Sequence, residues 1–63
     1  MIDEFDGIKV KIPRGYHLNS QGYYQNGHGV EYTLVGYGSS DPVICLETVY
    51  AKHVRTIELE KVE

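Results

Sequence analysis

The stretch from residue 29 to residue 47, GVEYTLVGYGSSDPVICLE, constrains the fold most, because it holds most of the contiguous apolar residues of the chain. In its first half, apolar residues alternate with Glu31 and Thr33, which is the period of a half-buried strand. Its second half contains the unbroken apolar run VICL, which is typical of a more fully buried strand. The residues between them are rich in Gly, Ser, Asp and Pro and predict a turn. We therefore expect an antiparallel pair of strands at the centre of a small all-β fold.

The length of 63 residues predicts one domain, residues 1–63, because a chain this short cannot fill a second core. The single cysteine cannot form an internal disulfide, which favours a reducing compartment. The first residues are acidic where a signal peptide is basic and then apolar, and no apolar run approaches the roughly 20 residues of a membrane span. We expect a cytoplasmic protein that has no membrane partner.

Strands are also expected on both sides of the central pair. Apolar and basic residues alternate in GIKVKI, residues 7–12, and Pro13 ends that strand because proline cannot donate to the ladder. We expect residues 1–6 to be a frayed end from which Phe5 reaches back to the core. Residues 52–62, KHVRTIELEKV, leave two alternatives open: a strand with a bulge near Arg55 and Thr56, or a short helical turn at 58–61. A full C-terminal helix is the competing interpretation.

The segment RGYHLNSQGYYQNGH, residues 14–28, is too long for an ordinary structureless connection in so small a domain. Residues 16–18 and 23–25 are expected to pair across the turn at 19–22, and Asn26 and Gly27 are expected to form a second turn. The segment contains three of the six tyrosines, two of the three histidines and an arginine. Loops of this length usually have either internal structure or a functional role.

Binding hot spots are enriched in Tyr and Arg, because a rigid ring adds a large contact area at a small entropic cost. We therefore take the exposed rings of this segment, with the charged side chains beside them, as the candidate binding site. Its residues are Arg14, Tyr16, His17, Tyr23, Tyr24, His28 and Tyr37. The alternative is that one or two of these rings cap the open end of the core, and at Tyr16 both interpretations stay open. At least one ring of the pair Tyr23 and Tyr24 should be exposed, because neighbours on a strand point to opposite faces.

The layout of the chain resembles the small SH3-like barrels, including the KOW domains of translation factors. The resemblance rests on GIKVKIP as the first strand, the Tyr-rich segment in the place of the long first loop, GVEYTLVGYG and DPVICLET as the middle strands, and a closing chain end. It implies a four- to five-stranded antiparallel SH3-like barrel or a strongly curved sheet, with a short C-terminal helical turn as one ending. The chain lacks the tryptophan and the acidic loop cluster of signalling SH3 domains, so recognition of proline-rich peptides is not expected.

The sequence gives little support to a catalytic or metal-binding function. Cys45 lies within the most apolar run, where a cysteine acts as a small hydrophobe, and its one proposed catalytic partner is His53. The Ser and Asp residues near position 40 are better explained as turn formers, because the chain has no G-x-S-x-G elbow. His17 and His28 lack two further ligands at zinc spacing. We expect no enzymatic activity, no cofactor and no metal.

The sequence therefore predicts a small non-enzymatic protein-interaction module. Chains of this kind are often accessory proteins of phages or mobile elements that bind and modulate a host protein. A homodimer is a variant of this hypothesis, because a small domain with exposed edges gains stability by pairing. The alternative function is binding of single-stranded nucleic acid, in which Tyr23 and Tyr24 stack on bases while Lys9, Lys11 and Arg14 contact phosphates. The net charge of -3 argues against binding by a generally basic surface.

Overall fold

A computed structural model describes residues 1–50, 52 and 54–63 of the chain, and those residues form strands and turns without any helix. All of the strand pairs are antiparallel. In chain order the strands are β1 (Ile2–Phe5), β2 (Ile8–Lys11), β3 (His17–Leu18), β4 (Tyr24–Gln25), β5 (Glu31–Tyr37), β6 (Val43–Thr48) and β7 (Thr56–Glu58). The expected all-β class is confirmed.

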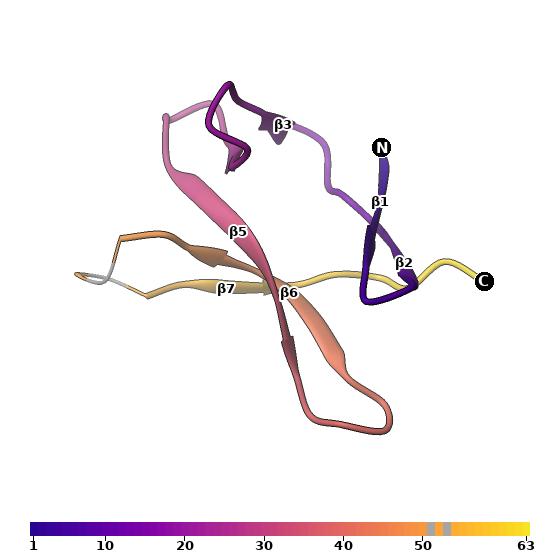
Figure 1. Ribbon diagram of the computed structural model, residues 1–63. Coiled ribbons are helices and arrows are strands. Elements are labelled where there is room, and N and C mark those ends of the chain that lie inside the picture. The colour runs from indigo at the N-terminus through magenta and orange to yellow at the C-terminus, as the bar shows by residue number, and fades with distance from the viewer. Residues whose placement is uncertain (51, 53) are drawn as a thin grey trace.

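The strands form two sheets, a hairpin of β1 and β2 and a five-stranded sheet in the order β3-β4-β5-β6-β7 (Figure 1). The chain end joins the two sheets, because the N–H of Lys11 donates to the carbonyl of Glu60 over 2.9 Å and the N–H of Val62 donates to the carbonyl of Lys9 over 2.8 Å. Among the described residues no ladder closes the sheets into a barrel, since β1 and β3 each have a single partner strand. The architecture is a pair of antiparallel sheets that share the chain end.

The first residues form a strand, so the expectation of a frayed N-terminal end is wrong. β1 pairs with β2 from Ile2 opposite Lys11 to Phe5 opposite Ile8. Asp6 and Gly7 connect the two strands, and both have positive φ, 50° and 79°. A two-residue hairpin turn of this kind matches the natural twist of the strands, which is why Asp-Gly is a strong hairpin signal. The expected contribution of Phe5 to the core is confirmed, since its ring packs against the buried cluster.

The Tyr-rich segment forms the expected two-stranded excursion. His17 lies opposite Gln25 and Leu18 lies opposite Tyr24. The turn between them is held by the side chain of Asn19, whose Oδ1 accepts the backbone N–H groups of Gln21 at 2.9 Å and Tyr23 at 3.1 Å. Asn side chains stabilise turns by such local bonds to the backbone. A second turn begins at Asn26, as expected, and leads the chain into β5.

The C-terminal part of the chain is extended, so the alternative of a helical turn at 58–61 and the longer helix are both wrong. The strand alternative holds without the bulge, because β7 pairs with β6 in one unbroken register as far as Arg55 and Thr56. After β7 the N–H of Leu59 donates to the carbonyl of Ile44 over 2.9 Å, and Lys61 forms a bridge with Val10. Val54 lies before the strand and is 61% exposed, so it does not follow the alternation of Ile57 and Leu59. His53, the proposed partner of Cys45, lies outside the described residues.

The core lies between the β1–β2 hairpin and one face of the five-stranded sheet. We call this side of the sheet the inner face; it carries Tyr24, Tyr32, Leu46 and Ile57, which lie opposite one another across the strands or pack into the same cluster. The buried residues of the cluster are Val10, Ile12, Tyr24, Tyr32, Ile44, Leu46 and Leu59. Each fully buried side chain of this size stabilises the fold by about 1.5–3 kcal/mol.

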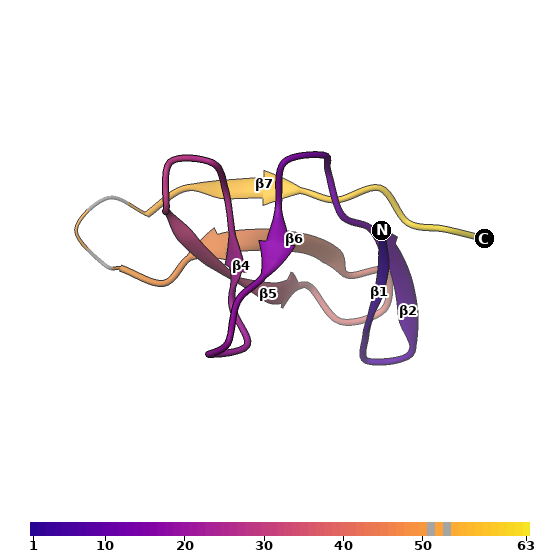
Figure 2. The same cartoon turned by 90° about the horizontal axis from the view of Figure 1, so that it is seen from above.

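The opposite side of the sheet, the outer face, carries the residues of the other parity, because successive side chains of a strand point to opposite sides. Its cross-strand pairs are Thr33 with Glu47, Val35 with Cys45, Tyr37 with Val43, and Cys45 with Glu58. Seen from above, β5, β6 and β7 run side by side and the β1–β2 hairpin stands at one end (Figure 2). The two faces of the sheet therefore have different surroundings.

Candidate functional site

The structure divides the residues of the expected binding site between the two faces of the five-stranded sheet and two loops. Tyr16 and Tyr24 pack on the inner face, against or within the buried cluster. Tyr37 lies on the outer face, and His17 lies opposite Gln25 in the short β3–β4 ladder. Arg14 and His28 are exposed in separate connections. The expected site is therefore not one surface.

Tyr24 is a core residue and cannot be an exposed anchor, which corrects the expectation for this residue. Its side chain is 3% exposed, and its hydroxyl donates a hydrogen bond to the carboxylate of Asp3 on β1. Burial raises the pKa of Tyr24, and the hydrogen bond to Asp3 adds to this effect. A buried tyrosine normally has a partner for its hydroxyl, and here that partner also ties β4 to β1.

Tyr16 takes the capping role that the sequence left open. Its ring meets the ring of Tyr32 edge to face, with centroids 5.4 Å apart and an interplanar angle of 77°. Burial raises the pKa of Tyr16, and the neighbouring Tyr32 hydroxyl raises it further. Pairs of this geometry contribute about 0.5–1.5 kcal/mol beyond the area that they bury. The half-buried ring of Tyr16 thus covers Tyr32 on the inner face.

The outer face carries Tyr37, whose side chain is 48% exposed. Its hydroxyl donates a hydrogen bond to the carboxylate of Glu47, and this bond is the main cause of the raised pKa of Tyr37. Tyr37 lies opposite Val43, whereas Glu47 lies opposite Thr33. To reach Glu47, the ring must therefore cross the pair of Val35 and Cys45. The ring is held in one place while much of its surface stays open to a partner.

Tyr50 is a second ordered and exposed ring that the sequence analysis did not single out. It is 60% exposed, and its hydroxyl donates to Glu31 Oε1 over 2.6 Å. The other oxygen of that carboxylate accepts Asn19 Nδ2, also over 2.6 Å. The hydrogen bond to Glu31 raises the pKa of Tyr50, and the nearby Tyr23 hydroxyl raises it slightly more. Tyr23 therefore lies close to Tyr50, and it is half-buried, so the expectation that at least one ring of the pair Tyr23 and Tyr24 is exposed is wrong.

Acidic side chains lie on the same face as these rings. Glu31 and Glu47 accept the tyrosine hydroxyls, and Glu58 lies opposite Cys45. Across the described part of the chain, the one ion pair joins Lys61 to Asp41 over 2.6 Å, and it lowers the pKa of the Asp41 carboxyl. The carboxylates of Glu31 and Glu47 thus have hydroxyl or amide partners rather than cations.

Cys45 is on the outer face and yet only 5% exposed, because its neighbours on β5, β6 and β7 cover it. Burial raises the pKa of its thiol, and the carboxylates of Glu58 and Glu47 raise it further. A thiol that stays protonated is a poor nucleophile. The surroundings of Cys45 suit a packed side chain.

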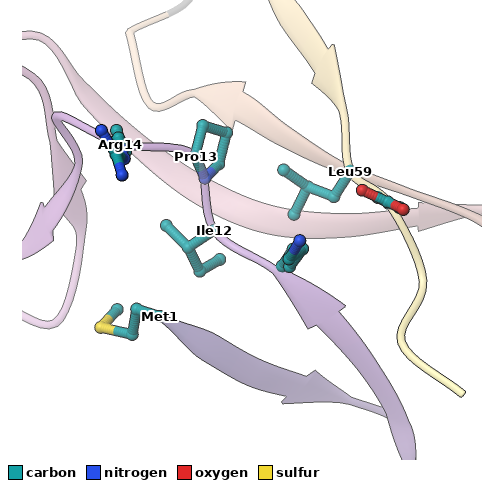
Figure 3. A pocket seen from close by; sticks show the side chains of 7 residues that line it. Met1, Ile12, Pro13, Arg14 and Leu59 are labelled. Carbon is teal, nitrogen blue, oxygen red and sulfur yellow. The ribbon is translucent and has the colours of Figure 1, made fainter.

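Arg14 and His28 line two separate hollows. Arg14 borders a hollow of about 400 Å³, together with Lys11, Glu60 and the apolar side chains of Met1, Ile12, Pro13 and Leu59 (Figure 3). His28 borders a second hollow of about 370 Å³, where Val30, Tyr32 and Arg55 are among the lining residues. Both hollows are open to solvent, and neither is lined by Tyr37 or Tyr50.

Within residues 1–50, 52 and 54–63, no three His, Cys, Asp or Glu side chains gather as a metal ion would require. None of these residues belongs to a helix that could cross a lipid bilayer. Comparisons with protein families, with curated proteins and with solved structures found no match to this chain. The candidate site is therefore defined by its own geometry: two ordered, exposed rings, Tyr37 and Tyr50, on an acidic sheet face.

Proposed function

We propose that this chain is a small non-enzymatic protein-interaction module whose partner binds the outer face around Tyr37 and Tyr50. The observation that carries the proposal is that both rings are about half exposed or more while their hydroxyls are held by Glu47 and Glu31. An exposed ring that is already ordered loses little conformational entropy when a partner covers it. Such rings are typical binding anchors.

The charge of the outer face suggests the chemistry of the partner. Glu47 and Glu31 hold the hydroxyls of the two rings, Glu58 lies opposite Cys45 on the same face, and no described cation pairs with these carboxylates. A partner surface that offers Lys or Arg at its rim would complement this field and would associate faster at low salt. The role in which a phage or mobile-element protein modulates a host protein fits such a module, and it remains a prediction.

The finer assignment to the SH3-like class is part of the same proposal. It is supported by the meander of β5, β6 and β7 and by the chain end, which returns to pair with β2 at Lys9 and Lys11. A cytoplasmic location is likewise proposed from the single unpaired cysteine. The homodimer variant stays a prediction.

No observation favours the alternative of nucleic-acid binding. Single-strand binding needs stacking rings and phosphate contacts along one surface. Val10 points into the core, so Lys9 and Lys11 point to the other side of the β1–β2 hairpin. Tyr24 is buried, and Tyr23 lies near Tyr50 beside the outer face. The residues expected for this function therefore do not share a surface.

Affinity capture from the native host lysate tests the proposal. The bait is the full chain beside the double variant Tyr37→Ala/Tyr50→Ala, and circular dichroism verifies that the variant stays folded. Leu18→Ala is the matched control, because Leu18 is 52% exposed but lies opposite Tyr24, on the other side of the sheet from the two rings. We expect a partner that the double variant loses and the control keeps. A partner retained by the double variant, or lost equally by the control, would contradict the proposal.

A further inference from the structure

The outer edge of β7 offers unpaired backbone groups. The N–H of Leu59 donates to Ile44 and the carbonyl of Arg55 accepts from Thr48, so the odd-numbered residues of this strand direct their backbone groups toward β6. Because the direction alternates along an antiparallel strand, the backbone groups of Thr56 and Glu58 point away from β6. No described residue forms a backbone hydrogen bond with them.

Beyond the end of β7, the same edge of the chain is paired with β2. The carbonyl of Glu60 and the N–H of Val62 bond to Lys11 and Lys9 of β2. In this register Pro13 would lie opposite Glu58, but proline has no N–H to donate. The chain then turns away at Gly15, whose φ is 89°. The ladder stops there, and β7 is the edge strand of the five-stranded sheet on this side.

The hollow beside Arg14 lies where β2 leaves this ladder. Ile12, Pro13 and Leu59 converge on it, with Met1 below them (Figure 3). A strand added to β7 would continue the line of β2, and one of its side chains would stand over this hollow. Strand addition of this kind takes affinity from main-chain hydrogen bonds and specificity from pockets for alternate side chains.

The charges at the hollow favour one direction of the added strand over the other. Lys11 and Arg14 are exposed at the end of β2, and no described carboxylate forms an ion pair with either of them. Glu60 also borders the hollow and opposes them in part. A strand that runs parallel to β7 ends at these cations, whereas a strand in the opposite direction begins there with its ammonium group. Attraction favours the arrangement that brings a terminal carboxylate to Lys11 and Arg14.

We propose that an extended peptide with a free terminal carboxylate adds to the outer edge of β7, parallel to it, and places its last apolar side chain in the hollow beside Arg14. This inference is independent of the proposed function, since it uses the backbone edge of β7 and the hollow beside Arg14 rather than the rings of Tyr37 and Tyr50.

The other edges of the sheets are less suitable. At β1 the N–H of Glu4 is already taken by Asp3 Oδ1 over 2.7 Å, and the strand is acidic. β3 is only two residues long. A second copy of the chain is a poorer occupant of β7, because a pair of three-residue strands buries far less than the roughly 1,200–2,000 Å² of a stable interface.

The test is a titration of the isotope-labelled full chain, followed by NMR. The probe is a short acetylated peptide of alternating threonine and valine that ends in valine with a free carboxylate, and its amidated form is the comparison. We expect shifts at the amides of Thr56, Glu58 and Arg14, and roughly two- to fivefold weaker binding after amidation, as for loss of a partly exposed ion pair.

Two protein variants and one modified peptide locate the site. Arg14→Gln should weaken binding of the free-carboxylate peptide about as much as amidation does, roughly two- to fivefold, with no further loss when both changes are combined. Arg55→Gln is the matched control, because Arg55 precedes β7 at its other end. Methylation of the peptide nitrogens should abolish binding without altering the protein.

Three results would overturn the proposal. The first is that the NMR shifts are confined to other surfaces, or that no shifts occur at millimolar peptide. The second is equal binding of the free and amidated peptides. The third is that the protein alone sediments as a dimer that Thr56→Pro dissociates, which would mean that a second copy of the chain occupies this edge. None of these results bears on Tyr37 or Tyr50, so the proposed function and this inference can fail separately.

Discussion

Tyr24 and Tyr37 are the same residue type on neighbouring parts of one sheet, yet they have opposite surroundings. Tyr24 is 3% exposed and bonds across the core to Asp3, whereas Tyr37 is 48% exposed and bonds along the surface to Glu47. In both, a carboxylate holds the hydroxyl. The comparison teaches that the parity of a residue on its strand, and not the local richness in tyrosine, decides whether a ring builds the core or stays available to a partner.

The largest expected effect comes from removing an inner ring. Tyr24→Ala should cost about 3–5 kcal/mol, because it leaves a cavity between β4, β5 and β1. A loss of that size is comparable with the total stability of a chain this short, roughly 0.05–0.15 kcal/mol per residue. We expect urea unfolding followed by circular dichroism to show a largely unfolded variant. An unfolding midpoint close to that of the wild type would contradict the assignment of Tyr24 to the core face.

A smaller effect is expected where the hairpin docks on the inner face. A Cβ at Gly36 would lie 2.7 Å from Cε1 of Phe5, so the ring would have to move. Gly36→Ala should therefore destabilise the fold by about 1–3 kcal/mol, as overpacking does. The double variant Phe5→Leu/Gly36→Ala, measured by the same unfolding experiment, should cost less than the sum of the two single changes. Simple additivity would show that Phe5 does not cover Gly36.

Because of the Tyr24 hydroxyl, the stability of the fold should decrease as the pH becomes alkaline. Its pKa is raised above the ordinary value of 10.0 in the folded state, so its contribution is fully present below pH 10 and is lost as pH rises above that value. Thermal unfolding should show this loss in the wild type, and Tyr24→Phe should reduce it. At neutral pH the same variant should cost about 1–2 kcal/mol, because the Asp3 carboxylate loses its donor. An unchanged alkaline profile in Tyr24→Phe would assign the loss to other tyrosines.

The smallest effect on stability is expected at the outer face. Tyr37→Ala should leave the unfolding midpoint nearly unchanged, because an exposed ring contributes little to folding. The ring crosses Cys45, however, so its removal should speed the reaction of that thiol with an aromatic disulfide reagent. Tyr50→Ala is the control, because Tyr50 bonds to Glu31 at the other end of β5. Equal thiol rates in the wild type and in Tyr37→Ala would mean that the ring does not shield Cys45.

Much of the fold could be predicted because the central strands have clear patterns. The alternation around Tyr32 and the apolar run at Cys45 give β5 and β6, and the turn residues at 19–22 give the register of Leu18 opposite Tyr24. β1 was missed because Asp3 and Glu4 lower its strand propensity. The signal that would have found it is the dipeptide of Asp6 and Gly7, which connects the two strands with positive φ at both residues.

The candidate site was harder to predict than the fold. A two-residue strand such as β4 has no alternation from which parity can be read, so the sequence could not show that Tyr24 faces inward. The role of Tyr24 follows from its position opposite Tyr32, which is a long-range pairing. Tyr50 lies after β6 and has no pattern around it; only its bond to Glu31 shows that its ring is ordered.

Hydroxyl-radical footprinting of the folded chain, with tandem mass spectrometry to separate the six tyrosines, tests the central claim most directly. Oxidation of a ring by this reagent follows its exposure to solvent rather than the ionisation of its hydroxyl. The account predicts that Tyr37 and Tyr50 are oxidised fastest, that Tyr24 and Tyr32 are protected until the chain unfolds, and that Tyr16 and Tyr23 lie between. Oxidation of Tyr24 at the rate of Tyr37 in the folded protein would contradict the division between the two faces.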